Sequence, residues 1–205
     1  MTDLFDKDAK ESVDNISHKN IPLAEKLRPK ILDEVIGQDK TLASDGQLKS
    51  MVKSGQLSSI IFWGPPGVGK TTLARVIANE VSAHYEEISA IFSGVSDLKK
   101  LLTAASVRHS NGLKTILFVD EIHRFNKSQQ DSFLPYMENG TIVLIGATTE
   151  NPSFELNSAL LSRSNVILLE RLNAEDLRKI FTRAIGFMGN SPIFSDDAIS
   201  LIIHM

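Results

Sequence analysis

Cysteine is absent from this chain of 205 residues. Disulfides and thiolate zinc sites are therefore excluded, and the composition suits a reducing compartment such as the cytosol. Long apolar runs are missing too, because no stretch approaches the roughly 18 residues that a membrane-spanning helix needs. The opening residues, Met1 to Asp6, show neither the basic n-region nor the apolar h-region of a secretory signal. We therefore expect a cytoplasmic protein that does not enter a membrane.

A strong excess of either charge is also lacking. The formal net charge is −3, from 22 basic and 25 acidic side chains. This balance argues against an indiscriminately basic nucleic-acid binder, although it leaves room for a local basic surface. With 42% hydrophobic and 23% charged residues, the composition is that of a globular fold. The length suits one domain, or one domain with part of a second.

The most informative segment is the glycine-rich stretch GPPGVGKTT at residues 64–72, which fills the pattern GxxxxGK(S/T) at every fixed position. An apolar run at 59–63 precedes it, and residues 73–79 have helical spacing. A plain Gly/Pro turn would explain the glycines but not this order of strand, loop and helix. Glycines let successive N–H groups face a triphosphate, and the helix adds the positive end of its dipole. The ATP-binding residues predicted here are Gly64, Pro65, Pro66, Gly67, Val68, Gly69, Lys70, Thr71 and Thr72.

Within this loop two side chains have distinct expected roles. Lys70 can reach the β- and γ-phosphates, and the Thr71 hydroxyl can bind Mg²⁺. A pair of acids, Asp120 and Glu121, follows the buried-type strand at 115–119. Because carboxylates at the end of such a strand lie beside the phosphate loop, we expect Asp120 to help hold hydrated Mg²⁺ and Glu121 to polarise the attacking water. Alone, two acids that end a strand would indicate no function.

Two later features are less specific. In the segment GATTENP at 146–152, either Thr148 or Thr149 could contact the γ-phosphate or orient the water, and the residues do not distinguish them. Ordinary turn chemistry explains the Asn-Pro part of that segment. Arg163 carries the group best suited to charge on a transferring phosphoryl, supplied in some ATPases by a neighbouring subunit. From the residues alone, a surface arginine is the preferred interpretation.

Alternating strands and helices predict a parallel five-stranded sheet covered on both faces. The strands are expected at 59–63, 85–88, 115–119, 141–145 and 166–169. Helices are expected at 39–53, 70–82, 97–109 with Ser96 as cap, 127–138 and 155–163, followed by two capped by Asn173 and Ser195. We expect a mobile N-terminal arm at 1–20, a core at 21–172 and a helical lid at 173–205.

Three segments together resemble AAA+ ATPases of the clamp-loader clade, and more narrowly the replication-associated recombination protein A family, related to the eukaryotic Werner-helicase-interacting protein. They are GPPGVGKTT, LFVDEIHRFNKSQQDSFLP and GATTENPSFELNSALLSR. The segment LAEKLRPKILDEVIGQ is similar to the adenine-side motif of that clade. The resemblance covers about residues 21–205 and implies an AAA+ P-loop NTPase fold.

The resemblance implies site residues one by one. The adenine pocket would be lined by Arg28, Pro29, Val35, Ile36 and Gly37. Thr148 would stand at the sensor-1 position, where many clamp loaders carry asparagine, and Arg163 would be the finger that completes a neighbour's site. His123 is interpreted as a packing or hydrogen-bonding residue rather than a metal ligand. The basic residues Lys99, Lys100, Arg108, Arg124 and Lys127 either face DNA or form a solvated surface.

The resemblance also implies a function. Members are homo-oligomeric, DNA-dependent ATPases that use ATP and Mg²⁺ in replication-fork maintenance, DNA repair and recombination. Forked or single-stranded DNA and replication proteins would be partners, and the location would be the cytoplasm, at the nucleoid. The family's lid continues with a sensor-2 arginine and an oligomerisation region, so residues 173–205 are expected to be a truncated lid. The open alternatives are a non-hydrolysing ATP-binding scaffold or partner-binding module and, less well supported, a small-molecule kinase.

Overall fold

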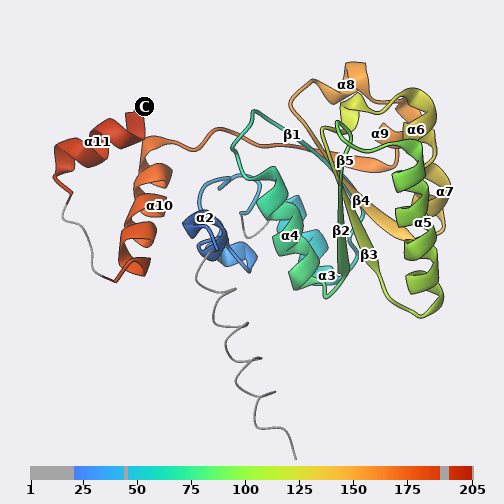
Figure 1. Ribbon diagram of the computed structural model, residues 1–205, viewed down its shortest axis with the longest axis horizontal. Helices are drawn as coiled ribbons and strands as arrows, with labels where there is room; N and C mark the ends of the chain where they lie inside the picture. The colour runs from blue at the N-terminus through green and yellow to red at the C-terminus, as the bar shows by residue number, and fades with distance from the viewer. Residues whose placement is uncertain (1–20, 44–45, 190–193, 205) are drawn as a thin grey trace, which may run out of the picture. The chain divides into compact units, whose positions relative to one another are not determined.

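The computed structural model describes residues 21–43, 46–189 and 194–204 (Figure 1). The chain divides into two compact units, of which the larger is Pro29–Leu177 and the smaller combines Met1–Arg28 with Arg178–Met205. The arm expected at residues 1–20 lies outside the described residues. The boundary expected after residue 172 stays a prediction, as does the lid. Among the described residues, every helix is too short or too polar to cross a bilayer.

A parallel sheet of five strands, in the order β2-β3-β4-β1-β5, forms the centre of the larger unit. Its strands are β1 (Ser59–Trp63), β2 (His84–Ser89), β3 (Thr115–Asp120), β4 (Ile142–Thr148) and β5 (Ser164–Leu168). All five lie where the apolar runs predicted them, within three residues at each end. The order brings the carboxyl ends of β3, β4 and β1 next to one another at one edge of the sheet, where such folds bind ligands.

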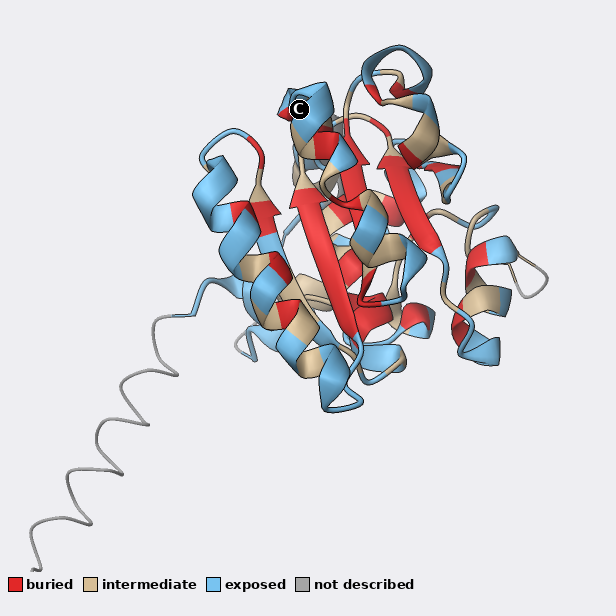
Figure 2. Ribbon diagram, turned by 90° about the vertical axis from the view of Figure 1, so that its right-hand side faces the viewer, coloured by how far each residue is buried: buried red, intermediate tan, exposed pale blue. Residues whose placement is uncertain are grey.

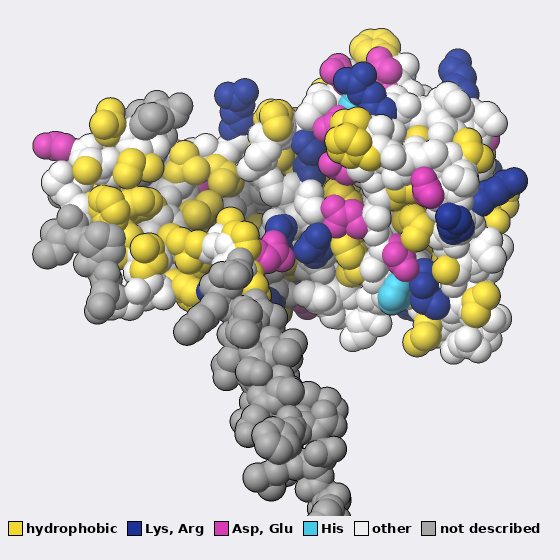
Figure 3. Space-filling model, in the orientation of Figure 1, with side chains coloured by type: hydrophobic (Ala, Val, Ile, Leu, Met, Phe, Trp, Pro, Cys, Tyr) yellow, Lys and Arg dark blue, Asp and Glu magenta, His cyan; other side chains and the backbone are white. Residues whose placement is uncertain are grey.

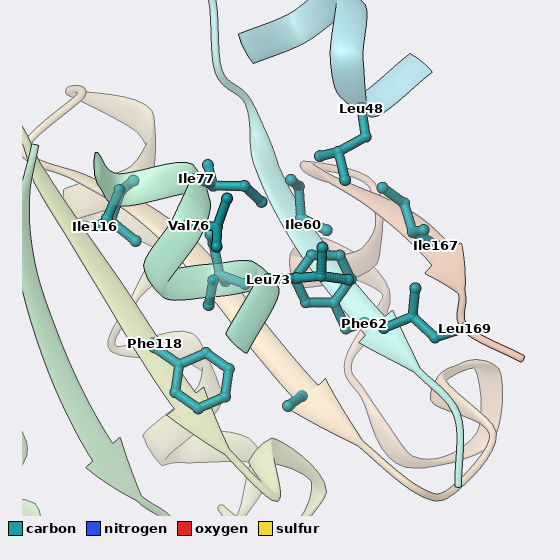
Figure 4. Close-up of a cluster of buried hydrophobic side chains, with 14 of the residues drawn as sticks. Leu48, Ile60, Phe62, Leu73, Val76, Ile77, Ile116, Phe118, Ile167 and Leu169 are labelled. Carbon is teal, nitrogen blue, oxygen red and sulfur yellow. The ribbon is translucent and has the colours of Figure 1, made fainter. Parts of the chain in front are cut away.

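Two apolar layers enclose the sheet, because successive side chains of a strand point to opposite faces. Ile60 and Phe62 of β1 belong to the cluster that includes α4, whereas Ile61 between them belongs to the cluster that includes α5. Figure 4 shows the first cluster, with the side chains of α4 beside those of the strands. Figure 1 shows α3 and α4 on one face and α5, α6 and α7 on the other, and Figure 2 shows how fully the strands are buried. The predicted two-sided cover is confirmed.

The helices differ from the expected ranges at several ends. They are α2 (Leu23–Lys26), η1 (Leu32–Glu34), α3 (Gln47–Ser54), α4 (Lys70–Glu80), α5 (Val95–Ser110), η2 (Ile122–Arg124), α6 (Lys127–Asp131), α7 (Leu134–Glu138), α8 (Pro152–Glu155), α9 (Ser158–Leu161), α10 (Ala174–Phe187) and α11 (Asp196–His204). The single helix expected at 127–138 is wrong, because Pro135 lacks the N–H that would continue α6 and instead occupies the first turn of α7.

Three further expectations on helices need correction. The helix expected from residue 39 begins only at Gln47, since Thr41 and Leu42 form a turn on the carbonyl of Gln38. The expected cap Ser96 lies inside α5, whose N-cap is Gly94; Asp97 accepts the Gly94 N–H at 3.1 Å. The helix expected at 155–163 is split in two, because Asn157 accepts the Leu160 N–H and starts α9. By contrast, the expected caps Asn173 and Ser195 each accept an N–H three residues on.

Candidate nucleotide site

The phosphate loop connects the end of β1 to the start of α4. Gly64 lies so close to the Leu169 carbonyl that a Cβ would collide with it, and its N–H donates to the Thr148 carbonyl at 3.1 Å. Gly67 and Gly69 have φ values of +81° and +96°, which side chains rarely adopt. No described residue lies within 4 Å of a Cβ built at either glycine. The loop is therefore tied to β4 and β5 at its base and open at its turn.

Lys70 starts α4 at the inner end of this loop. Its side chain is bent back, so that Nζ donates to the carbonyl of Gly64 at 2.6 Å and to that of Pro65 at 2.8 Å. Burial lowers the pKa of Lys70, and the nearby carboxylates Glu121 and Asp120 oppose that shift. Both carboxylates act electrostatically on the Lys70 ammonium, and the sheet order places the acids after β3 and the phosphate loop after β1 at the same edge. An anion in the loop would offer this ammonium a stronger partner than two carbonyls.

Asp120 and Glu121 differ in backbone conformation although they are neighbours. Asp120 is the last residue of β3, whereas Glu121 has φ 50° and ψ 46° and leads into η2. A left-handed conformation is strained for a residue with a side chain and recurs at functional sites. Ile122, fully buried beneath the turn, is part of the core that holds it there. The two adjacent acids therefore differ in backbone conformation, one ending β3 and the other beginning the turn into η2.

The end of β4 supplies two threonines with different partners. Thr149 donates from Oγ1 to Glu121 Oε2 at 3.3 Å. Thr148 is fully buried, and its Oγ1 lies 2.9 Å from His123 Nδ1 and accepts the Glu150 N–H at 3.0 Å. The geometry therefore gives Thr149 the contact with the Glu121 carboxylate, although the resemblance favoured Thr148 at the sensor-1 position. His123 is the hydrogen-bonding residue that the sequence indicated.

Residues 29–37, expected on the adenine side, lie beside the loop through Gln38. The Gln38 side chain donates to the carbonyl of Glu170 at 2.7 Å and to that of Val68 at 3.5 Å, and accepts the Glu170 N–H at 3.0 Å. Val35 packs against the α4 cluster, and Gly37 lies against Leu172. Pro29 and Ile36 are half-buried in the same segment. Gln38, for which the sequence pattern indicates no role, ties this segment mainly to Glu170 and more weakly to the phosphate loop at Val68.

Arg28 belongs to the smaller unit, apart from the other predicted adenine-side residues. Its Nη2 forms an ion pair with Glu25 Oε2 at 2.6 Å, three residues earlier in the chain. The structure therefore describes its local partner only, and its place in an adenine pocket stays a prediction.

Arg163 lies at the opposite edge of the sheet from the loop. It immediately precedes β5, whose Ser164 pairs with Ser59 at the start of β1, whereas the phosphate loop follows Trp63 at the end of β1. Five strand residues span roughly 16 Å, farther than an arginine side chain reaches. The guanidinium instead bonds Glu138 Oε1, at 2.8 Å from Nε and 2.6 Å from Nη2. Arg163 therefore cannot serve the phosphate loop of its own chain.

The residues predicted to hold Mg²⁺ are Thr71, in the first turn of α4, and Asp120, at the end of β3. Both are half-buried and offer oxygen donors, which Mg²⁺ prefers. Mg²⁺ retains several waters and shares substrate phosphates, so one hydroxyl and one carboxylate suit it. The donor set therefore fits the cofactor that the loop implies.

Comparison with known proteins identifies the family of this chain. The family model described as "ATPase family associated with various cellular activities (AAA)" matches residues 60–172, more than half of the chain. The chain belongs to the AAA family. Replication-associated recombination protein A of Escherichia coli (strain K12) is 51% identical over 189 residues, which cover 90% of this AAA chain and 42% of that protein. ATPase WRNIP1 of Dictyostelium discoideum is 47% identical over 188 residues, covering 90% and 22%.

These relatives confirm the predicted family, that of replication-associated recombination protein A and WRNIP1. The AAA chain spans about two-fifths of the bacterial relatives it matches. Among solved structures, the RuvB Holliday junction branch migration motor of Thermotoga maritima superimposes with a TM-score of 0.67 and 33% identity, over 86% of this chain and 59% of that one. The AAA+ fold expected from the sequence is thereby confirmed.

The basic residues considered for DNA contact do not behave alike in the AAA chain. The Arg108 side chain bonds other residues of the fold: Nη1 pairs with Glu86 Oε1 at 3.1 Å, and Nε donates to Thr115 Oγ1 at 3.1 Å. Lys99 and Arg124 are exposed, and Lys100 lies 3.9 Å from Asp97. On the face shown in Figure 3, basic and acidic side chains of the larger unit are interspersed. Arg108 therefore bonds side chains of β2 and β3, whereas Lys99 and Arg124 are exposed.

Proposed function

We propose that this chain binds ATP with Mg²⁺ and hydrolyses it in a site that a second copy completes. The observation that carries the proposal is the separation of the two catalytic charges. Lys70 and Glu121 both lie at the carboxyl edge of the sheet, whereas Arg163 lies at the amino edge and bonds Glu138. Arg163 of each copy is thus too far from its own phosphate loop to contact a nucleotide bound there. A head-to-tail assembly of identical chains supplies the loop of one copy with the Arg163 of the next.

The chain's own residues then have separate tasks. The backbone N–H groups of residues 67–72 and the Lys70 side chain hold the phosphates, and the adenine side of the nucleotide lies against Pro29, Val35, Ile36 and Gly37. Glu121 orients and polarises the water that attacks the γ-phosphate in line, and Thr149 holds that carboxylate. Thr71 and Asp120 would hold Mg²⁺, which neutralises charge on the β- and γ-phosphates. Arg163 of the neighbouring copy stabilises the charge that develops in the transition state.

The biological process is proposed from the relatives. Replication-associated recombination protein A and WRNIP1 are relatives of this chain, and a RuvB branch migration motor shares its fold. We infer that ATP turnover drives the remodelling of forked or single-stranded DNA during replication-associated recombination and repair, at the bacterial nucleoid. The exposed lysines Lys99 and Lys100 on α5 and Lys127 on α6 would contribute salt-dependent contacts to DNA phosphates.

The test is ATP turnover by the chain over a wide range of protein concentration, with and without forked and single-stranded DNA. We expect turnover per chain to rise with protein concentration, because the site needs a neighbour, and to rise further with DNA. Nucleotide binding is measured in parallel with a fluorescent ATP analogue. Tight binding without turnover at the highest concentration would overturn the hydrolase proposal and favour a nucleotide-binding scaffold. Absence of nucleotide binding would overturn both.

A further inference from the structure

His123 connects the ends of two strands through a single ring nitrogen. Its side chain is only 6% exposed, and Nδ1 lies 2.9 Å from Thr148 Oγ1 and 3.3 Å from Glu121 Oε2. Glu121 follows β3, and Thr148 ends β4. The imidazole thus bridges the proposed catalytic carboxylate and the neighbouring strand, although neither the phosphate loop nor the comparisons assign it a role.

The hydrogen-bond partners determine which ring nitrogen carries the proton. An ionised carboxylate accepts hydrogen bonds and donates none, so a bare Nδ1 beside Glu121 Oε2 would set two lone pairs against each other. A proton on Nδ1 removes this repulsion, can be donated to Thr148 Oγ1 at 2.9 Å, and leaves the positive end of the N–H dipole close to Glu121 Oε2 at 3.3 Å. The Thr148 hydroxyl then donates to the Glu150 carbonyl at 3.3 Å and accepts the Glu150 N–H at 3.0 Å. The Thr148 hydroxyl is thereby satisfied both as an acceptor and as a donor.

Only one oxygen of the Glu121 carboxylate is involved in these contacts. Oε2 accepts from Thr149 Oγ1 at 3.3 Å and lies beside the His123 N–H. Among the described residues, no hydrogen bond or ion pair engages Oε1. A carboxylate held through one oxygen keeps the other in a fixed direction for a water, and orientation of this kind supplies much of catalysis. The left-handed backbone of Glu121 alone would leave its side-chain torsions free to vary.

We propose that His123 is the positioning residue for Glu121 in ATP hydrolysis, with its Nδ1–H as the group that acts and Thr148 as the anchor of its ring. The inference rests on the proposed function. His123 touches neither nucleotide nor water, and it acts by holding the carboxylate that orients the water. Thr148 and Thr149 then divide the task, because one fixes the imidazole while the other contacts the carboxylate directly.

The test compares His123→Leu with His123→Asn in the otherwise unchanged chain. Leucine fills similar space without a donor, whereas the asparagine amide can place an N–H near the position of Nδ1. We expect His123→Leu to lower kcat by roughly 10- to 100-fold, the cost of a misplaced catalytic group, with the nucleotide Kd unchanged. We expect His123→Asn to stay within a few-fold of the parent chain. An unaffected kcat in the leucine variant, or an equal loss in both, would overturn the positioning role.

A second variant keeps the test decisive if His123→Leu does not fold, as judged by thermal unfolding. Thr148→Val replaces the hydroxyl by a methyl group of the same shape and removes the anchor of the ring. We expect kcat to fall several-fold with Kd unchanged, and an unchanged kcat in a folded Thr148→Val chain would overturn the proposal. Where His123→Leu does fold, adding Thr148→Val to it should cause no further loss of kcat. Additive losses in the double variant would show independent actions and overturn the proposal. Absence of turnover in the parent chain would instead overturn the proposed hydrolase function, a result distinguishable from either of these.

Discussion

The two edges of the sheet hold their charged groups in different ways. At the carboxyl edge, Lys70 is 8% exposed, Thr148 is fully buried, and the His123 side chain is 6% exposed. At the amino edge, the side chains of Arg163 and Glu138 are 41% and 52% exposed and pair with each other. One edge is therefore organised within the chain, and the other faces solvent.

This difference fits a site divided between two copies. Groups that work within one chain gain from burial, because low dielectric strengthens their interactions and packing fixes their positions. A group that must enter a neighbour's site has to stay at the surface until the neighbour arrives. The exposed ion pair with Glu138 contributes little and can be exchanged for a phosphate partner. The comparison therefore predicts that a second copy can restore the turnover lost through a variant at the amino edge, but not the turnover lost through a variant at the carboxyl edge.

The largest effect is expected at the carboxyl edge, from Lys70→Ala. Losing charge-assisted hydrogen bonds to two phosphates should weaken ATP binding by at least about 100-fold, and turnover should become undetectable. Binding of a fluorescent ATP analogue measures the first effect, and phosphate release the second. Lys114→Ala is the matched control, because that lysine lies at the amino end of β3 with a single long contact to the Gly55 carbonyl, and it should bind ATP normally. Equal losses in both variants would break the comparison.

Arg163→Ala should come next, with turnover lowered about 1,000-fold, as when an arginine finger is removed, and ATP binding retained. Whether Arg163 acts at the site of a neighbouring copy can be tested by mixing two variant chains. A Lys70→Ala chain cannot bind ATP but still carries Arg163, so it should restore turnover in the loop of an Arg163→Ala chain. Turnover of the mixture above that of either variant alone is the expected result. A mixture as inactive as its components would show that the two edges do not meet between copies.

The third effect, about 100-fold or more on kcat, is expected from Glu121→Gln, which keeps the shape of the side chain but removes the basic oxygen. The nucleotide Kd should not change, since the phosphates are held by the loop. Glu150→Gln is the matched control, because Glu150 is exposed and only its backbone bonds Thr148. Turnover and Kd are measured on the same preparations. A loss of ATP affinity in Glu121→Gln would mean that this carboxylate supports the loop rather than the water.

Much of the fold followed from the sequence because its signals are local. The apolar runs located all five strands, and GPPGVGKTT located the loop between β1 and α4. The errors arose where a turn competes with a helix. Residues 39–43 fold back on the Gln38 carbonyl, and Pro135 interrupts what the polar–apolar pattern presented as one helix. Periodicity resolves neither competition. The turn at 39–43 depends on the availability of the Gln38 carbonyl, whereas the break before α7 follows from the missing N–H of Pro135, a local signal that the periodic pattern overrode.

The site was predictable as a set of residue types but not as a set of contacts. Thr148 and Thr149 are adjacent at the end of β4 and so point in different directions. Which one meets Glu121 depends on the left-handed turn at Glu121, which the sequence does not reveal. The pair Arg163–Glu138 joins residues 25 positions apart, and Gln38 reaches Glu170 across 132 positions. Such pairings are set by the sheet order, so only the three-dimensional structure defines them.

The smallest effect is expected from Glu138→Gln, which tests whether the amino edge restrains its arginine. An exposed ion pair is worth about 0.2–1 kcal/mol, so its removal should raise turnover at sub-saturating protein concentration by at most about five-fold. Turnover at saturating concentration should not change, because Glu138 has no part in the assembled site. Glu87→Gln, which breaks the exposed pair with Arg75, is the control and should have no effect. A fall in turnover would instead mean that Glu138 aims Arg163 at the neighbouring site, and the amino edge would then be as organised as the carboxyl edge.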